Sequence, residues 1–320
     1  MRSAIARRPR ALAGGVAVVA VLVGASACST ASSDTADESA RGKTVSGKVI
    51  RVVAAENFWG SIAQQLGGSH VHVKSIIDNP AADPHDYEPT AADGRAVATA
   101  RYTIVNGIGY DPWADKLLSA NPDNDRTGLK VGDLVGVRPG GNPHRWYSPA
   151  DVRKVIEKIT ADYKKIAPAD ADYFDARKKT YLATTLATYN QLVSGIKSTY
   201  AGTPVGASES IVTPLAQGLG LKLLTPDSFL DAISEGADPT AKDKTAIDRQ
   251  IKDKKIKVYV YNSQNSTPDV RAQVKEAKAA GTPVATVTET LTPAGSSFQD
   301  WQVRQLKGLQ TALDRATGRK

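Results

Sequence analysis

Two histidines in proline-bounded turns are the residues of this sequence best placed to do chemistry. His85 lies in DPHDYEP and His144 lies in NPHRWYSP, so each follows a proline and precedes an aromatic residue and a second proline. Proline fixes the backbone angle φ and restricts the residue before it, so an imidazole held in such a turn loses little entropy on binding. The spacing alone leaves two interpretations open, a pair of metal ligands or two polar loops.

The other two histidines, His70 and His72, lie two residues apart in SHVHV. On a strand they would share one face, where they could chelate a metal ion. We prefer the alternative, two exposed histidines at a strand edge. The sequence contains no glycine-rich phosphate loop, no Ser-His-Asp context and no nucleophile elbow.

The N-terminus is a targeting segment. A basic stretch, MRSAIARRPR, precedes the apolar ALAGGVAVVAVLVGASA, which is shorter than a membrane span of about 20 residues. The only cysteine, Cys28, follows in GASAC and resembles the acylated cysteine of a bacterial lipobox, although Ala25 stands where a larger aliphatic residue is usual. We expect a signal peptide with a lipobox over 1–28, with a soluble secreted protein as the alternative. The polar residues 29–48 predict a disordered tether.

The elements that must position the two histidines alternate between strand and helix. The chain is 41% hydrophobic, which is enough for two core-bearing domains. Short strand patterns alternate with helical patterns of about ten residues, which is typical of α/β folds with mostly parallel sheets. The net charge of +8 is concentrated partly at the two ends, and no basic patch is interleaved with aromatic residues, so nucleic acid is not an expected partner.

A long helical pattern divides this alternation into two halves. Between Ala171 and Tyr200 there is no proline, and the only glycine is Gly195. At about 1.5 Å per residue such a helix would be roughly 40 Å long. We therefore predict two α/β lobes joined by a single long, rigid helix: an N-terminal lobe over 49–170, the linking helix over 171–200 and a C-terminal lobe over 201–320.

The motifs DPHDYEPTAAD, NGIGYDPWADKLL and NPHRWYSPADV, in this order, resemble those of the cluster A-I solute-binding proteins. These are lipoproteins that capture zinc or manganese for bacterial ABC importers. The resemblance covers nearly all of residues 48–315 and implies a metal cleft between the two lobes. It identifies His85 and His144 as metal ligands of the first lobe. It also implies a third ligand at Glu209 and a fourth at Glu289, where the family often has aspartate.

The resemblance implies a protein that captures a metal ion and is not an enzyme. Two neutral imidazoles and two carboxylates balance a divalent ion, and four protein ligands leave no obligatory open position for catalysis. The donor set tolerates zinc and manganese, and the general affinity order favours zinc. The expected partners are the metal ion as cargo and the permease of an ABC importer. The protein is expected to be a monomer, anchored by lipid to the outer face of the bacterial cell membrane.

Two other functions are compatible with the sequence. An extracellular metal-dependent hydrolase could use Glu88, three residues beyond His85, as a general base. The prolines on each side argue against the helical H-E-x-x-H geometry of zinc proteases. A surface adhesin is the second alternative, although nothing in the sequence encodes attachment separately. The histidine-rich loop that many zinc-capturing members carry between the two histidine motifs is absent from NPDNDRTGLKVGDLVGVRPGG.

Overall fold

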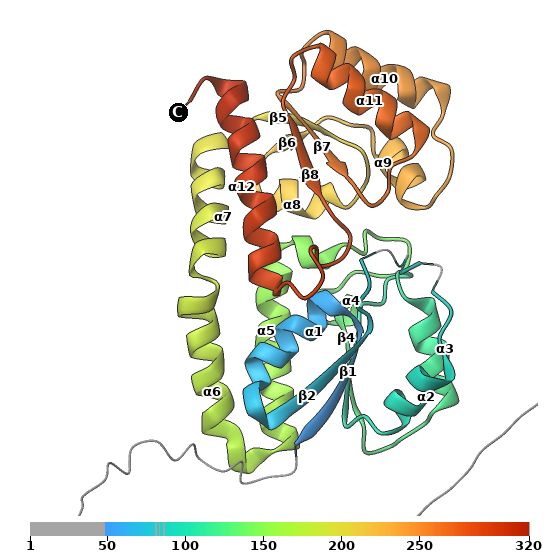
Figure 1. Ribbon diagram of the computed structural model, residues 1–320, viewed down its shortest axis with the longest axis vertical. Coiled ribbons are helices and arrows are strands. Elements are labelled where there is room, and N and C mark those ends of the chain that lie inside the picture. The colour runs from blue at the N-terminus through green and yellow to red at the C-terminus, as the bar shows by residue number, and fades with distance from the viewer. Residues whose placement is uncertain (1–48, 81, 83, 86, 320) are drawn as a thin grey trace, which may run out of the picture. The chain divides into compact units, whose positions relative to one another are not determined.

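Two four-stranded parallel β-sheets form the framework of the protein (Figure 1). The computed structural model describes residues 49–80, 82, 84–85 and 87–319. The predicted signal peptide, Cys28 and the predicted tether lie outside these residues. Within the described part of the chain, none of the helices has both the length and the apolar character needed to cross a membrane.

The first sheet has the strand order β2-β1-β3-β4. The central strand β1, IRVVAAE, is apolar on both faces and almost entirely buried, as expected where helices cover a parallel sheet on both sides. Residues of α1 and α5 pack on one face, and residues of α2 and α3 pack on the other. The elements are β1 Ile50–Glu56, α1 Asn57–Gly67, β2 Val71–Ile77, α2 Ala91–Ala98, β3 Tyr102–Val105, α3 Pro112–Ala120, β4 Thr127–Lys130, α4 Val131–Val135 and α5 Pro149–Ile166.

The second sheet repeats this arrangement with the strand order β6-β5-β7-β8. Apolar residues of α8 and α12 pack on one face, and those of α9, α10 and α11 pack on the other. The two predicted α/β lobes with parallel sheets are therefore confirmed. The elements are β5 Pro204–Ala207, α8 Val212–Leu219, β6 Lys222–Leu223, α9 Asp227–Ser234, α10 Ala241–Lys252, β7 Val258–Asn262, α11 Pro268–Ala279, β8 Val284–Val287 and α12 Phe298–Thr317.

The linking helix contains one wide turn. It consists of α6, Ala171–Thr180, a π-helical turn over Tyr181–Thr185 and α7, Ala187–Tyr200 (Figure 1). In a regular helix, residues five apart point about 140° away from each other. The wide turn lets both Tyr181 and Leu186 reach the buried side, where each is only 2% exposed. The predicted long helix therefore continues from Ala171 to Tyr200 with one widened turn, which allows Tyr181 and Leu186 both to be buried.

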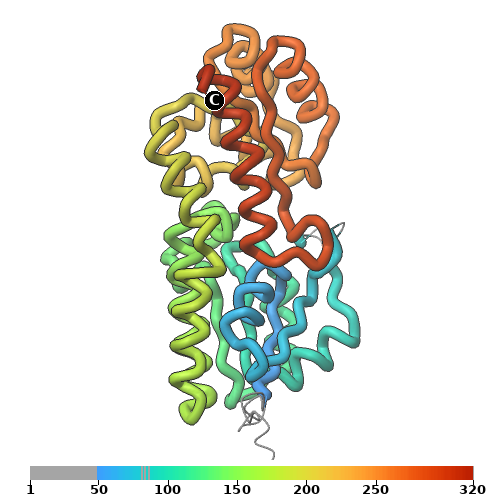
Figure 2. Tube along the Cα trace, turned by 60° about the vertical axis from the view of Figure 1, so that its left-hand side comes forward, coloured from blue at the N-terminus to red at the C-terminus, as the bar shows by residue number. Residues whose placement is uncertain are grey.

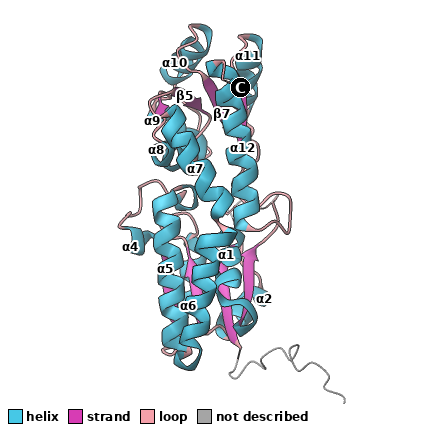
Figure 3. Ribbon diagram, turned by 90° about the vertical axis from the view of Figure 1, so that its left-hand side faces the viewer, coloured by secondary structure: helices cyan, strands magenta, loops and turns pink. Residues whose placement is uncertain are grey.

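The C-terminal helix α12 is a second connection between the lobes. It runs beside α7, as Figures 2 and 3 show from two directions. At its start, the backbone N–H of Phe298 donates to Ser61 Oγ at 2.9 Å. The amides of Gln299 and Gln65 exchange hydrogen bonds of 2.9 and 3.0 Å. The residues 201–320 assigned to the C-terminal lobe thus include a helix that also contacts the first lobe.

Candidate metal centre

A cleft of about 690 Å³ is lined by residues that follow strands of both sheets. His85 follows β2 in the chain, and His144 follows β4 and the short helix α4. Glu209 comes two residues after β5, and Glu289 two residues after β8. Ligands of α/β proteins bind in crevices at the carboxyl ends of the strands, and all four predicted ligands line such a crevice.

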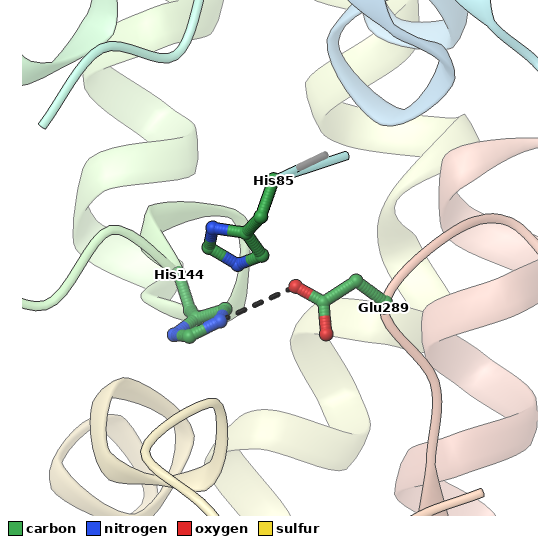
Figure 4. A group of neighbouring side chains, drawn as sticks. All are labelled: His85, His144 and Glu289. Atoms are coloured by element: carbon green, nitrogen blue, oxygen red, sulfur yellow. Dashed lines mark ion pairs between the residues drawn. The ribbon is translucent and has the colours of Figure 1, made fainter. Parts of the chain in front are cut away.

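Three of the predicted ligands converge on one point. His85, His144 and Glu289 each offer a ligand atom, and these atoms all lie within 4.8 Å of one another (Figure 4). His144 Nε2 is 3.3 Å from Glu289 Oε1. Two ligand atoms on a tetrahedral zinc ion with bonds of about 2.0–2.1 Å are about 3.3–3.4 Å apart. The spacing of this pair therefore suits one shared metal ion.

The orientation of the His144 ring is fixed by Asn142. Asn142 Nδ2 donates to the carbonyl oxygen of Ser210 at 2.7 Å, so Asn142 Oδ1 is turned toward His144. This oxygen accepts from the backbone N–H and from Nδ1 of His144, both at 3.0 Å. In the neutral ring the proton is then on Nδ1, and the lone pair of Nε2 faces the Glu289 oxygen. Two acceptors this close need a cation or a proton between them.

The loop that carries His85 is anchored at the preceding residue. Trp113 of α3 donates from Nε1 to the carbonyl oxygen of Pro84 at 3.0 Å. The His85 ring meets the Tyr110 ring edge to face, with a centroid separation of 4.7 Å and an interplanar angle of 75°. The anchor and the ring contact leave His85 half-buried beside the cleft.

Aromatic side chains form the floor beneath the two histidines. Trp146 is fully buried, and its ring lies 5.3 Å from His144, 4.9 Å from Tyr110 and 4.0 Å, stacked, from Phe58. This layer excludes water from one side of the site. Charges in the site are therefore screened less than charges at the surface.

Glu289 is held by donors from both lobes. Its Oε1 accepts from the Tyr110 hydroxyl, and its Oε2 accepts from Asn262 Nδ2, each at 3.0 Å. Burial raises the pKa of Glu289, but the positive charge that His144 and His85 carry when protonated, together with hydrogen bonds from His144 and Tyr110, outweighs burial and brings the pKa below its usual value. The carboxylate is therefore ionised and available to a cation.

Glu209 lines the same cleft but does not join the cluster of three. Its side chain is only 1% exposed. Oε1 accepts from Asn262 Nδ2, and Oε2 accepts from Asn265 Nδ2, both at 2.7 Å. The structure thus brings together three of the four predicted ligands and holds Glu209 on two amides next to them.

A buried pair of acids lies behind the site. Glu56 ends β1 with no exposed surface, and Asp111 is 2% exposed. Asp111 accepts from the backbone N–H groups of Asn106 and Gly107 at 2.7 Å. Burial, and then the charge of Asp111, raise the pKa of Glu56 well above its usual value, so Glu56 retains a proton. Asn106 Nδ2 donates to the carbonyl oxygen of Pro143 at 3.0 Å, which connects this pair to the His144 loop.

The remaining histidines have other surroundings. His70 lies in a turn before β2, 3.2 Å from Asp170 and stacked on Tyr173. The prediction of an exposed strand-edge residue is therefore wrong for His70, whereas His72 is exposed on β2 as predicted. Glu88, the base of the hydrolase alternative, is exposed and is not among the residues that line the cleft.

The residues that orient the ligands are not predicted from the sequence. They are Asn142, Tyr110 and Asn262, and each contacts a predicted ligand directly. Two signals point to them in hindsight: an asparagine directly before the proline of NPH, and the amide-rich YNSQN at the end of a buried strand.

The chain is similar to a family model and to several known metal-binding proteins. A family model described as ZnuA, zinc-uptake complex component A, periplasmic, matches residues 52–312. The manganese-binding lipoprotein MntA of Halalkalibacterium halodurans is 27% identical over 146 residues, 44% of this chain and 48% of the relative. The zinc-binding lipoprotein AdcA of Streptococcus pneumoniae is 25% identical over 280 residues, 78% of this chain and 53% of the relative. The chain thus matches about half the length of these curated relatives.

A solved structure shows the same fold. The Mn-bound periplasmic metal binding protein of Candidatus Liberibacter asiaticus superposes with a TM-score of 0.69 at 19% identity, over 82% of this chain and 99% of that one. The family match extends over most of the chain, from β1 to α12. The chain therefore belongs to the family described as ZnuA, zinc-uptake complex component A, periplasmic.

Proposed function

We propose that this protein captures a divalent transition metal ion outside the cytoplasm and delivers it to an ABC importer. The observation that carries this proposal is the convergence of His85, His144 and Glu289 within 4.8 Å at a cleft lined by both lobes. A neutral His144 ring facing an ionised Glu289 is unfavourable without a cation between them. The site is therefore built for an ion that the two lobes enclose.

The donor set favours zinc and tolerates manganese. Imidazole nitrogen suits zinc, and carboxylate oxygen suits both ions, while the general affinity order places zinc above manganese. We propose Glu209 as the fourth ligand, reached when its carboxylate leaves Asn265. Four protein ligands then complete the shell of a zinc ion and leave no position for a catalytic water, so we infer capture rather than hydrolysis.

We further propose that the protein is a monomer anchored by lipid at Cys28. Relatives named as lipoproteins, together with the order of basic, apolar and small residues before this cysteine, support the anchor. Changing Cys28 to serine should release the protein into the medium. A wild-type protein that is already unacylated and soluble would rule out the anchor without affecting metal capture.

Metal analysis tests the function directly. Protein purified without chelator or added metal should contain close to one equivalent of zinc or manganese. After the metal is removed, calorimetry should show one site for each ion and no turnover of ester or peptide substrates. A protein that binds neither ion stoichiometrically would refute the proposal.

A further inference from the structure

Asn262 occupies a unique position between the two acidic residues of the second lobe. It is the last residue of β7, one of the two central strands of its sheet, and it has no exposed surface. Its backbone N–H donates to Ser208 Oγ at 3.0 Å, which fixes the main chain at the edge of the cleft. A side chain buried here is held in place by the sheet rather than by a mobile loop.

The amide of Asn262 has one defined orientation. Its Oδ1 accepts from the backbone N–H of Gln264 at 3.0 Å. Its Nδ2 donates to Glu209 Oε1 at 2.7 Å and to Glu289 Oε2 at 3.0 Å. Turning the amide over would place Oδ1 against two carboxylate oxygens and an NH₂ group against an N–H group. Both hydrogens of a single NH₂ group are therefore committed, one to each carboxylate.

The Asn262 NH₂ group forms an amide bridge, because it hydrogen-bonds one oxygen of each carboxylate. Glu289 faces His144 with Oε1, which also accepts from the Tyr110 hydroxyl, while its Oε2 accepts from the Asn262 amide. Glu209 Oε1 is held by the same amide, so Oε2 is the oxygen that can turn toward an ion after leaving Asn265. Each carboxylate can then coordinate through a single oxygen while Asn262 retains the other.

From this geometry we infer that Asn262 determines metal specificity by enforcing single-oxygen coordination at both carboxylates. This inference rests on the proposed function. Two imidazoles and two single oxygens give four ligands, the number that zinc prefers in protein sites. Manganese prefers about six, mainly oxygen, ligands, which the same side chains could supply only if both carboxylates chelated through both oxygens. The amide bridge prevents this and so selects against manganese.

The test compares wild type with Asn262→Ala in metal-free protein. The dissociation constants for Zn²⁺ and Mn²⁺ are measured by chelator competition. Loss of a residue that orients a ligand lowers metal affinity about 10- to 100-fold. We expect such a loss for zinc and a much smaller one for manganese, so that the preference for zinc falls by about tenfold or more. A purely structural role for Asn262 would weaken both ions alike.

Cobalt provides a readout of coordination number that is independent of affinity. Four-coordinate Co²⁺ absorbs visible light much more strongly than five- or six-coordinate Co²⁺. Saturated wild-type protein should give the intense spectrum, and saturated Asn262→Ala the weak one. Asn265→Ala is the matched control: it removes the other amide from Glu209 but leaves the bridge, so it should keep the intense spectrum and the zinc preference.

The outcomes distinguish failure of the proposed metal capture from failure of the role inferred for Asn262. Wild type that binds none of the three ions would overturn the proposed function and this inference with it. If wild type binds the three ions and Asn262→Ala keeps the wild-type zinc preference and cobalt spectrum, the inference about Asn262 is overturned and the proposed function stands. If Asn262→Ala does not fold, Asn262→Ser replaces it, because a hydroxyl has one hydrogen and cannot hold both carboxylates. An Asn262→Ser protein with wild-type preference and spectrum would likewise overturn the inference.

Discussion

Replacing Glu56 by glutamine should stabilise the protein, increasingly so as the pH rises. Glu56 is fully buried beside Asp111, and burial raises its pKa well above the usual 4.5. Glutamine has the same shape, and its NH₂ group can donate to Asp111 as the protonated acid does. The variant thus keeps the contact but removes the proton equilibrium.

The magnitude follows from proton linkage. Above about pH 4.5 the unfolded chain releases the Glu56 proton, whereas the folded protein keeps it until the pH reaches the raised pKa. The folded state binds more protons in this window, so wild type loses stability as the pH rises through it. The stability of wild type relative to Glu56→Gln therefore falls with a slope that approaches about 1.4 kcal/mol per pH unit, until the pH reaches the raised pKa. Below about pH 4.5 both states hold the proton, and this contribution to the difference vanishes.

Urea unfolding of metal-free protein measures this difference. Tryptophan fluorescence reports the transition because Trp59, Trp146 and Trp301 are buried. Unfolding free energies of wild type and Glu56→Gln are compared at several values between about pH 4 and about pH 8. Glu88→Gln is the matched control, since it makes the same substitution at an exposed site. Parallel curves for wild type and Glu56→Gln would mean that Glu56 is ionised in the folded protein and would contradict the protonated state inferred from its burial.

Three further predictions address the site and its scaffold. Zinc affinity should fall as the pH is lowered from about 7.5 to about 5.5, because protons compete with the metal ion for the ligands. Calorimetry that finds the same zinc affinity across this range would contradict the prediction. Gly67→Ala should lower the unfolding free energy by about 1–3 kcal/mol, because the added Cβ would lie 2.8 Å or less from Val71 side-chain atoms. Gly195→Ala in α7, where no atom lies within 4 Å of the added Cβ, should instead raise the unfolding free energy by about 0.5–1 kcal/mol. If urea unfolding shows stability changes of the same sign for the two variants, the packing described here is contradicted. Tyr147→Phe should lower it by about 1 kcal/mol in the same assay, because the hydroxyl lies 2.8 Å from the Thr288 carbonyl oxygen across the lobes; no loss would show that this contact contributes nothing.

The alternation of strands and helices is readable in the sequence because both sheets are parallel and covered on two faces. A central strand such as IRVVAAE is then mostly apolar, with four consecutive apolar residues, and the helix after it has one apolar face. Neither β4 nor α9 is predicted from the sequence. β4 has only four residues, TGLK, and joins the sheet through pairing with β3, a tertiary contact that local pattern does not contain.

The predicted ligands differ in how far the sequence reveals them. His85 and His144 are marked by their prolines, and Glu289 is found only through the resemblance to a family. The amide bridge at Asn262 depends on three segments meeting at the ends of β5, β7 and β8, which only the folded sheet defines. Glu209 lies outside the cluster of the other three predicted ligands and accepts from Asn265, 56 positions away in the chain.

Metal capture at this cleft is tested most directly by zinc calorimetry on wild type, His85→Ala and His144→Ala, each stripped of metal. Both histidines lie in the cluster with Glu289, so removal of either leaves a site that lacks one of its two nitrogen donors. We expect one tight site in wild type and a loss of affinity in each histidine variant that exceeds the loss in Glu289→Ala, because water replaces a carboxylate oxygen more readily than an imidazole. Wild-type affinity in both histidine variants would contradict metal capture at this cleft.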